Sequence, residues 1–301
     1  MTDGRGPREP GQPGRPEREV PLLGGIANQG HVVRVGDTVR RPQRSWSAAT
    51  HALLLHLEAV GFEGAPRFLG LDSRGREVLS YIPGTAIVEP YPDWALTDKA
   101  LISVAELLRA YHDAASTFDP LPYSWAPAPP EGFVGDIVTH NDINLDNVVF
   151  RDGRGVALID FDLAGPGSRA WDVACAARLW APLRPGVYIS DTRRGRELER
   201  FRLFVDSYGM NDSDRVKVAE GIQQNYEWFY HLIKSSAASG HAAFAQLWTF
   251  KTSVRAELTM QWYAENERNL RTALGIQPAS AQCQGDEWFR PLSGAARRRS
   301  R

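Results

Sequence analysis

The stretch that decides the fold covers residues 138–174 and reads VTHNDINLDNVVFRDGRGVALIDFDLAGPGSRAWDVA. Short apolar runs in it alternate with side chains that bind metals or accept protons, namely His140, Asp142, Asp146, Asn147, Asp160, Asp162 and Asp172. The apolar runs 148–150 and 157–159 are typical of two hairpin arms around a turn at 151–155. This stretch therefore predicts a β-hairpin with polar groups at its open end.

The predicted hairpin brings oxygen-bearing side chains together. If Phe150 lies opposite Ala157, antiparallel pairing places Asn147 opposite Asp160, with Asp142 one short loop upstream. Carboxylate and amide oxygens are ligands for a hard cation such as Mg²⁺, which also uses substrate phosphates. A further carboxylate outside the cation's ligand sphere can accept a proton from a hydroxyl and hold it in line, as phosphoryl transfer requires.

The alternative interpretation of these acids is that they are solvated turn residues. We adopt that interpretation for Asp146 and Asp152. For Asp142, Asn147 and Asp160 together we prefer the functional one, because two separate motifs point to the same chemistry.

The two motifs are HNDINLDN at 140–147 and IDFD at 159–162. Together they resemble the H-x-D-x-x-x-x-N and I-D-x-x pair of the aminoglycoside phosphotransferase/choline kinase-like family. The likeness extends over roughly residues 22–290 and is specific at 138–174. It implies a protein-kinase-like α+β fold with two lobes, a small strand-rich N-terminal lobe and a larger helical C-terminal lobe. It also implies transfer of the γ-phosphoryl group of ATP to a hydroxyl, with Mg²⁺.

The resemblance implies a role for each matching residue. Asp142 corresponds to the catalytic base that orients the acceptor hydroxyl. Asn147 and Asp160 correspond to the Mg²⁺ ligands that bridge the nucleotide phosphates. Asp162 either assists the metal or approaches the acceptor.

Two further residues correspond to parts of the catalytic loop that do not touch the substrate. His140 resembles the histidine that shapes this loop, and we group it with the catalytic residues in that role. Asp172, in the sequence WDVA, resembles a buried aspartate that accepts backbone N–H bonds and braces the loop.

The N-terminal lobe is expected to cover ATP. Residues 24–30 read GGIANQG between two predicted strands, where Gly25 and Asn28 let backbone N–H groups approach phosphates. This segment does not match G-x-G-x-x-G, and a plain hairpin is the alternative. The family's hinge implies that backbone groups of Ser80 and Ile82 bind the adenine, whereas an ordinary strand end before a Pro-Gly turn is the other interpretation.

One departure from kinases concerns the lysine of the third strand. The corresponding strand reads TVRRP at 38–42, so its basic candidates are Arg40, which fits the strand phase better, and Arg41. Arginine stays charged and can bind phosphate in a bidentate manner. His51 occupies the helix position where a glutamate is usual, so the ion pair is absent or rebuilt from Glu58.

The character of the sequence changes along the chain. We expect a flexible leader at 1–20, a nucleotide-covering lobe at 21–82, a connector at 83–98, a helical catalytic and acceptor lobe at 99–290, and a basic flexible tail at 291–301. Apolar residues recur at helical spacing, and we interpret these stripes as core faces: Leu53, Leu57, Val60; Leu101, Val104, Leu108, Tyr111; Leu198, Phe201, Val205, Tyr208; Ile222, Tyr226, Phe229, Ile233; and Val254, Leu258, Trp262.

Composition excludes several classes of protein. The 301 residues contain 35 basic and 36 acidic side chains, and this balance gives no reason to expect a nucleic-acid partner. Two cysteines in no CxxC pattern argue against a disulfide framework and fit a reducing compartment. With neither a membrane-length apolar run nor an apolar signal segment, we expect a cytoplasmic protein that does not bind membranes, and we predict no protein partner.

The acceptor is expected to be a small molecule with a hydroxyl group. Residues 190–271 contain eleven acidic and twelve basic side chains, a balance that gives no support to a polycationic acceptor. Two other functions stay open. A nucleotide-binding pseudokinase or regulatory module would fit the missing lysine–glutamate pair, and a protein kinase is disfavoured because the chain runs almost directly from Asp160 to Trp171.

Overall fold

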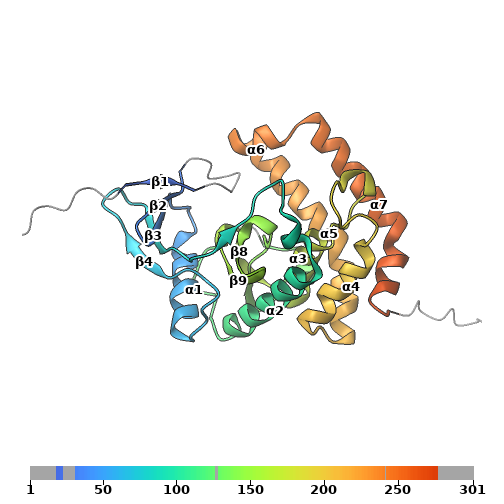
Figure 1. Ribbon diagram of the computed structural model, residues 1–301, viewed down its shortest axis with the longest axis horizontal. Helices are drawn as coiled ribbons and strands as arrows, with labels where there is room; N and C mark the ends of the chain where they lie inside the picture. The colour runs from blue at the N-terminus through green and yellow to red at the C-terminus, as the bar shows by residue number, and fades with distance from the viewer. Residues whose placement is uncertain (1–17, 23–30, 126–127, 241, 277–301) are drawn as a thin grey trace, which may run out of the picture.

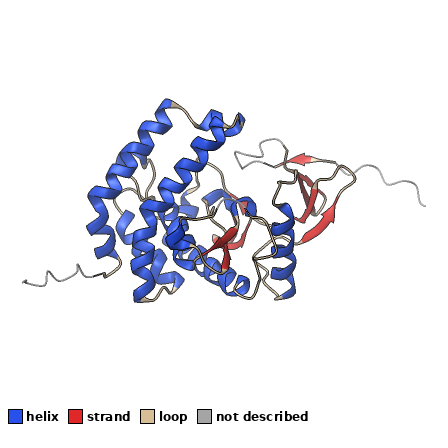
Figure 2. Ribbon diagram, turned by 180° about the vertical axis from the view of Figure 1, so that it is seen from behind, coloured by secondary structure: helices blue, strands red, loops and turns tan. Residues whose placement is uncertain are grey.

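The computed structural model describes residues 18–22, 31–125, 128–240 and 242–276. A small lobe of strands with one helix lies beside a larger lobe that is mostly helical (Figure 1). Strands also occur inside the larger lobe, where helices surround them (Figure 2). The predicted α+β fold with two lobes is confirmed.

The N-terminal lobe is built on a five-stranded antiparallel sheet. Its strands, in spatial order, are β1 (Val20–Pro21), β2 (Val33–Val35), β3 (Thr38–Arg41), β5 (Glu77–Ser80) and β4 (Phe68–Leu71). Strands β3 and β5 are central neighbours, so residues opposite each other on these two strands can form cross-strand pairs.

Helix α1 (Ser47–Ala59) packs its leucines into the core. Leu53, Leu54 and Leu57 are fully buried, which confirms most of the predicted stripe. Val60 was wrong as a core residue, because it follows the last helical turn and is 47% exposed. Gly61 then ends the helix with a φ of 79°, in the left-handed region that glycine adopts readily.

The connector between the lobes contains the short strand β6 (Thr85–Ala86) and leads into helix α2 (Asp98–Ala115). Thr97 caps α2 by accepting a hydrogen bond from the N–H of Ala100. The predicted stripe on this helix lies at the centre of the larger lobe: Leu101, Val104, Leu108 and Tyr111, all with no exposed surface.

Strands β8 (Val148–Arg151) and β9 (Arg154–Leu158) form the predicted hairpin, with β6 on its other side. Asp152 and Gly153 make the turn with φ of 52° and 73°, as a two-residue hairpin turn requires. The predicted register was wrong: Val149, rather than Phe150, lies opposite Ala157, because a bulge separates Val149 from Phe150. The hairpin still carries both motifs to one end.

A second pair of strands, β7 (Ile137–Thr139) and β10 (Gly165–Gly167), brackets residues 140–164, which carry both motifs and which we call the candidate catalytic segment. Short 3-10 helices lie at η1 (Asp93–Leu96), η2 (Glu131–Phe133), η3 (Leu145–Asn147), η4 (Phe161–Leu163) and η5 (Gly186–Tyr188). Two of them contain motif residues, since η3 forms the end of the 140–147 motif and η4 begins within the 159–162 motif. The motif residues therefore lie in tight turns between strands.

The remaining helices are α3 (Arg169–Trp180), α4 (Glu197–Tyr208), α5 (Asp212–Ala238), α6 (Ala242–Leu247) and α7 (Phe250–Ala273). Helices α3 and α5 approach closely at Gly221, where an added Cβ would lie 3.1 Å from the Cβ of Ala174. On α7 the predicted stripe was right for Trp262, which packs against the core, and wrong for Leu258. Leu258 is 42% exposed, whereas Thr259 and Tyr263, one residue later, are buried. No helix in the described part of the chain is both long enough and apolar enough to span a membrane.

The core of the larger lobe yields a stability prediction. Changing Leu108, which is fully buried, to Ala should lower the free energy of unfolding by about 2–5 kcal/mol, because the change removes buried apolar surface and leaves a cavity. Leu121→Ala is the control, since Leu121 is 88% exposed and its loss should change stability by less than about 0.5 kcal/mol. Urea denaturation measures both, and equal losses would contradict the assignment of this core.

Candidate active site

The loop after β7 carries the predicted base, Asp142. Its side chain is half-buried, and its two carboxylate oxygens accept hydrogen bonds from the side-chain amides of Asn144 at 2.7 Å and Asn147 at 3.1 Å. The same Asn147 amide also donates to the Asp142 carbonyl oxygen at 2.8 Å. Asp142 and Asn147 are therefore brought together and held in fixed orientation.

The carboxyl groups of this site have perturbed acidities. Burial raises the pKa of Asp142 to about 7, and the charges of Asp160 and Asp146 act in the same direction. Burial and the charge of Asp162 raise the pKa of Asp160 to about 6, while Arg41 opposes the rise. Several carboxylates thus share a poorly solvated region, where bound cations would favour their ionised forms.

Asp160 reaches the same region from the end of β9. The backbone links the two motifs directly, because the N–H of Ile159 donates to the carbonyl of Asn147 at 2.9 Å. Asp160 itself has a φ of 62°, a left-handed conformation that is uncommon for residues other than glycine. This conformation turns the chain into η4, so Asp160 and Asp162 both reach Arg41.

His140 has a structural position, as expected. It is fully buried, and its Nε2 lies 3.0 Å from the carbonyl oxygen of Ile159, while its Nδ1 accepts from the N–H of Asp142 at 3.4 Å. These partners assign the ring proton to Nε2. Because burial lowers the pKa of His140, the neutral ring joins the two motif segments without serving as an acid.

Asp172 braces the loop from helix α3. Its carboxylate accepts the backbone N–H groups of His140 at 2.7 Å and Asn141 at 2.8 Å. His112 of α2 lies within hydrogen-bond distance at 2.9 Å. Burial alone would raise the pKa of Asp172, but the hydrogen bond from His112 and the surrounding charges lower it below its ordinary value. The buried carboxylate is thus ionised and fully used in holding the loop.

Arg41 is the basic side chain of β3 that faces the carboxylates of the second motif. Its guanidinium forms an ion pair with Glu77 and contacts Asp160 at 3.1 Å and Asp162 at 2.9 Å. Burial alone would lower the pKa of Arg41, but these three acids raise it above its ordinary value. Arg41 therefore carries a permanent positive charge next to the motif residues of the larger lobe.

The preference for Arg40 over Arg41 on this side of the strand is not supported. Arg40 bonds the Thr38 hydroxyl and lies 3.8 Å from Asp72, because alternate strand residues point to opposite faces. Of the two alternatives for the ion pair, absence or rebuilding from Glu58, the second was wrong. Glu58 is 48% exposed in its side chain and lies 3.9 Å from Arg67.

Glu77 takes the place of the missing glutamate, and the sequence reasoning did not find it. Glu77 of β5 lies directly opposite Arg41 of β3 and is fully buried. His51, at the helix position where a glutamate is usual, contacts the same carboxylate at 2.8 Å and stacks on Phe68. An acidic residue in a predicted strand, beside a strand that ends in arginines, was the signal that could have indicated this pair.

The segment between β3 and α1 also contacts the second motif. Arg44 lies 3.1 Å from the carboxylate of Asp162, and the indole N–H of Trp46 donates to the Asp162 carbonyl at 2.8 Å. Asp162 is thus held by two arginines of the smaller lobe. These contacts indicate that Asp162 joins the two lobes. They are also compatible with the expected role of Asp162 in assisting a metal ion.

The described residues show only part of the predicted nucleotide side. Gly25 and Asn28 lie outside the described ranges. The N–H of Ser80 donates to the carbonyl of Arg67 at 2.9 Å, so the sheet already uses this donor. Ile82 lies just past the end of β5 and is half-buried. Among the described residues, no three His, Cys, Asp or Glu side chains form a metal-binding group of their own.

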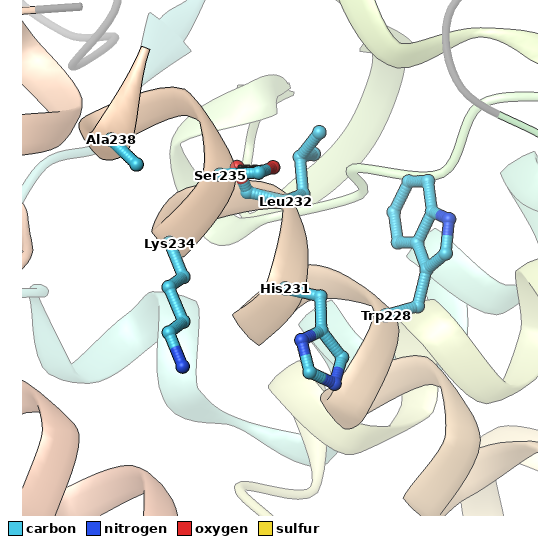
Figure 3. Close-up of a pocket in the computed structure, with 6 residues that line it drawn as sticks. All are labelled: Trp228, His231, Leu232, Lys234, Ser235 and Ala238. Carbon is cyan, nitrogen blue, oxygen red and sulfur yellow. Dashed lines mark hydrogen bonds between the residues drawn. The ribbon is translucent and has the colours of Figure 1, made fainter. Parts of the chain in front are cut away.

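A pocket of about 500 Å³ lies on the second half of α5. Its lining residues all belong to that helix: Trp228, His231, Leu232, Lys234, Ser235 and Ala238. Figure 3 shows His231 and Lys234 extending from the same side of the helix. The Trp228 ring lies 5.8 Å from Trp171, which directly precedes Asp172, so this helix approaches the candidate catalytic segment.

Comparison with known proteins agrees with this geometry. The profile described as the phosphotransferase enzyme family matches residues 134–204. The trifolitoxin immunity protein of Rhizobium leguminosarum bv. trifolii is 35% identical over 212 residues, which are 65% of this chain and 76% of that protein. The chain belongs to the phosphotransferase enzyme family. The matched profile contains both motifs and Asp172.

Solved structures of other proteins share this fold. The GDP complex of aminoglycoside 2'-phosphotransferase-IIIa matches with a TM-score of 0.55 at 14% identity, over 84% of this chain and 94% of the other. Plasmodium vivax ethanolamine kinase matches with a TM-score of 0.52 at 12% identity, over 84% and 83%. These likenesses support the two-lobed fold and leave the acceptor undetermined.

The pair between Glu77 and Arg41 yields a second stability prediction. Glu77→Ala should lower the free energy of unfolding by about 1–3 kcal/mol, because it leaves the Arg41 Nε and His51 without their common acceptor while Asp160 and Asp162 still compensate the charge of Arg41. Glu58→Ala is the matched control and should cost less than about 0.5 kcal/mol. Equal effects in guanidinium chloride denaturation would show that the buried pair does not hold this lobe.

Proposed function

We propose that this phosphotransferase-family protein transfers the γ-phosphoryl group of ATP to a hydroxyl of a small molecule, with Mg²⁺. The observation that carries the proposal is the convergence of Asp142, Asn147 and Asp160 at one end of the hairpin, with Arg41 opposite them. Phosphoryl transfer requires positioning and cancellation of charge rather than a covalent intermediate on the protein. The site offers groups for both tasks.

The donor set fits a magnesium ion. The Asn147 amide nitrogen donates to Asp142, which leaves its side-chain oxygen available as a ligand. Asp160 adds a carboxylate whose side chain is 27% exposed. Magnesium binds few protein ligands and relies on phosphates and water for the rest. Asn147 and Asp160 would hold the ion, whose positive charge would offset that of the nucleotide phosphates.

Asp142 is the group that orients and deprotonates the acceptor hydroxyl in this proposal. The amides of Asn144 and Asn147 fix its carboxylate, so the base is aligned before the acceptor arrives. Arg41 would contact the nucleotide phosphates, and Glu77 keeps its guanidinium in place. A phosphate group offers Arg41 an anionic partner in exchange for Asp160, which is thereby released for the metal.

The acceptor is a small hydroxylated compound in this proposal, and the α5 pocket is its candidate binding region. One matching structure is described as a gentamicin complex of APH(2")-IIa, with a TM-score of 0.51. The relative from Rhizobium carries the name of an immunity protein, which favours including antibacterial compounds among the acceptors to be tested.

The base is tested by Asp142→Asn. This change should lower the turnover number by about 10²–10⁴-fold, because the amide cannot accept the hydroxyl proton. Binding of a non-hydrolysable ATP analogue should be retained. Steady-state transfer over a panel of alcohols and calorimetric titration of the analogue measure the two quantities.

Asp152→Asn is the control for that substitution. Asp152 lies in the hairpin turn with φ of 52°, a conformation that asparagine also adopts readily. Unchanged turnover in Asp142→Asn would exclude Asp142 as the base. Tight nucleotide binding without transfer to any acceptor would instead favour the pseudokinase or regulatory module.

The phosphate anchor is tested by Arg41→Lys against Arg40→Lys. Lysine cannot bond Glu77 and a phosphate through one planar fork, so Arg41→Lys should weaken binding of the magnesium-bound ATP analogue by about tenfold. Arg40→Lys should leave the dissociation constant nearly unchanged, since Arg40 faces Asp72. If calorimetry shows a larger loss of affinity in Arg40→Lys than in Arg41→Lys, Arg40 is the residue that binds the phosphates.

A further inference from the structure

The apolar face of α5 extends beyond the part of the helix that is buried in the core. In the first half of the helix this face is buried at Val218, Gly221 and Ile222. Two turns after Gly221 the same face carries Trp228, and Leu232 follows one turn later. Both of these side chains are half-buried. Helix packing therefore leaves apolar surface along the α5 pocket, which these two residues line.

The indole of Trp228 is held in place from two directions. Its N–H donates to the carbonyl of Ala128 at 2.9 Å, and its ring meets the ring of Trp171 edge-to-face with the centroids 5.8 Å apart. Edge-to-face contact is a favourable arrangement of two aromatic rings. Because the indole is already positioned, stacking a further flat ring on it costs little ordering of the side chain.

The same two tryptophans connect the pocket with the loop that carries Asp142. Trp171 is fully buried, and its indole N–H donates to the side-chain oxygen of Asn141 at 3.0 Å. Asn141 directly precedes Asp142 in the chain. Trp228 is thus two side-chain contacts away from the residue next to the proposed base.

The polar lining of the pocket is basic. Lys234 lies six residues after Trp228, which places it about 9 Å farther along the helix axis. His231 lies between them, and its side chain extends from the same side of the helix as that of Lys234 (Figure 3). None of the described lining residues is acidic, and in the described part of the chain Lys234 forms no ion pair. The pocket therefore offers N–H donors and no carboxylate.

The volume of the pocket indicates the size of its ligand. A cavity of about 500 Å³ lies in the range that holds a drug-sized molecule, and such cavities bind through apolar walls with a few well-placed polar groups. A compound as small as glycerol would not extend from Trp228 to Lys234. A compound with a ring at one end and polar groups at the other would do so.

Resting on the phosphoryl transfer proposed above, we propose that the acceptor is a drug-sized hydroxylated compound with a flat apolar ring. The ring stacks on Trp228 and packs against Leu232, which brings the reacting hydroxyl to the loop of Asp142. Farther along the helix the compound presents oxygen atoms to Lys234 and carries no positive charge. A polycationic acceptor would instead place its ammonium groups against Lys234, where like charges repel.

The test compares three glucose-based probes by calorimetry, with magnesium and a non-hydrolysable ATP analogue filling the nucleotide site. Methyl β-glucoside supplies hydroxyl groups alone, naphthyl β-glucoside adds a flat ring, and naphthyl β-glucuronide also adds a carboxylate. We expect the naphthyl glucoside to bind about tenfold more tightly than the methyl glucoside, because stacking removes apolar surface from water. The glucuronide should gain about a further threefold from Lys234.

Matched variants assign each gain to one side chain. Trp228→Ala should abolish the gain from the naphthyl ring, whereas Trp228→Phe keeps a flat ring and should retain most of it. Lys234→Gln should abolish the gain from the carboxylate alone. Lys217→Gln is the control on the same helix and should change neither gain, because Lys217 is exposed and lies outside the pocket lining. Unchanged affinity for the ATP analogue shows that each variant is folded.

Two results would overturn the proposal. The first is equal affinity for the methyl and naphthyl glucosides, or a gain from the ring that survives in Trp228→Ala. The second is tighter binding of kanamycin than of the glucuronide, with the kanamycin affinity lost in Trp228→Ala, because a polycation would then occupy the pocket.

Transfer of radiolabelled phosphate to the same probes separates this inference from the proposed function. Transfer to the naphthyl probes, with a KM that rises in Trp228→Ala, supports both proposals. Transfer to methyl glucoside or kanamycin with a KM that Trp228→Ala leaves unchanged overturns the ring site and retains the phosphotransferase function. Binding that depends on Trp228, without transfer to any probe, retains the ring site and counts against phosphoryl transfer.

Discussion

The candidate catalytic segment depends on one buried carboxylate, that of Asp172. It accepts two successive backbone N–H groups, from His140 and Asn141, and a third bond from His112 on a different helix. A buried carboxylate is tolerated only when its lone pairs are satisfied, so the loop can leave this position only at the cost of an unpaired charge. Asn141 keeps a φ of 65° under this constraint. Because Asp172 fixes the backbone at His140 and Asn141, it also fixes the position of Asp142, the next residue.

The two lobes are coupled through charge rather than through apolar packing alone. Arg41 connects the buried Glu77 of the sheet to Asp160 and Asp162 of the larger lobe, and Arg44 adds a second contact to Asp162. The same guanidinium therefore compensates the acidic motif, and in the proposed function it also contacts the nucleotide phosphates. Protein kinases use a lysine on the third strand and a glutamate on the following helix instead. Here the partner comes from the neighbouring strand.

Much of the fold was predictable because periodic apolar residues report local structure, as on α2, where the stripe from Leu101 to Tyr111 is fully buried. The motif residues were predictable because their spacing combines two independent patterns. The predictions failed where a shift of one residue along a strand decides which side chains face each other. A bulge after Val149 shifts the hairpin register, and Arg41 faces inward instead of Arg40. The Arg41–Glu77 pair required the strand order β3–β5, which comes from tertiary pairing and not from local sequence.

The central claim is that Asn147 and Asp160 hold a divalent cation against the nucleotide phosphates beside Asp142. Electron paramagnetic resonance of free Mn²⁺ tests it directly, because Mn²⁺ accepts the same oxygen ligands as magnesium. The account predicts tight Mn²⁺ uptake that requires the ATP analogue and is lost in Asp160→Asn, with nucleotide-free protein binding little of the ion. Uptake that is independent of nucleotide, or unchanged in Asp160→Asn, would contradict it.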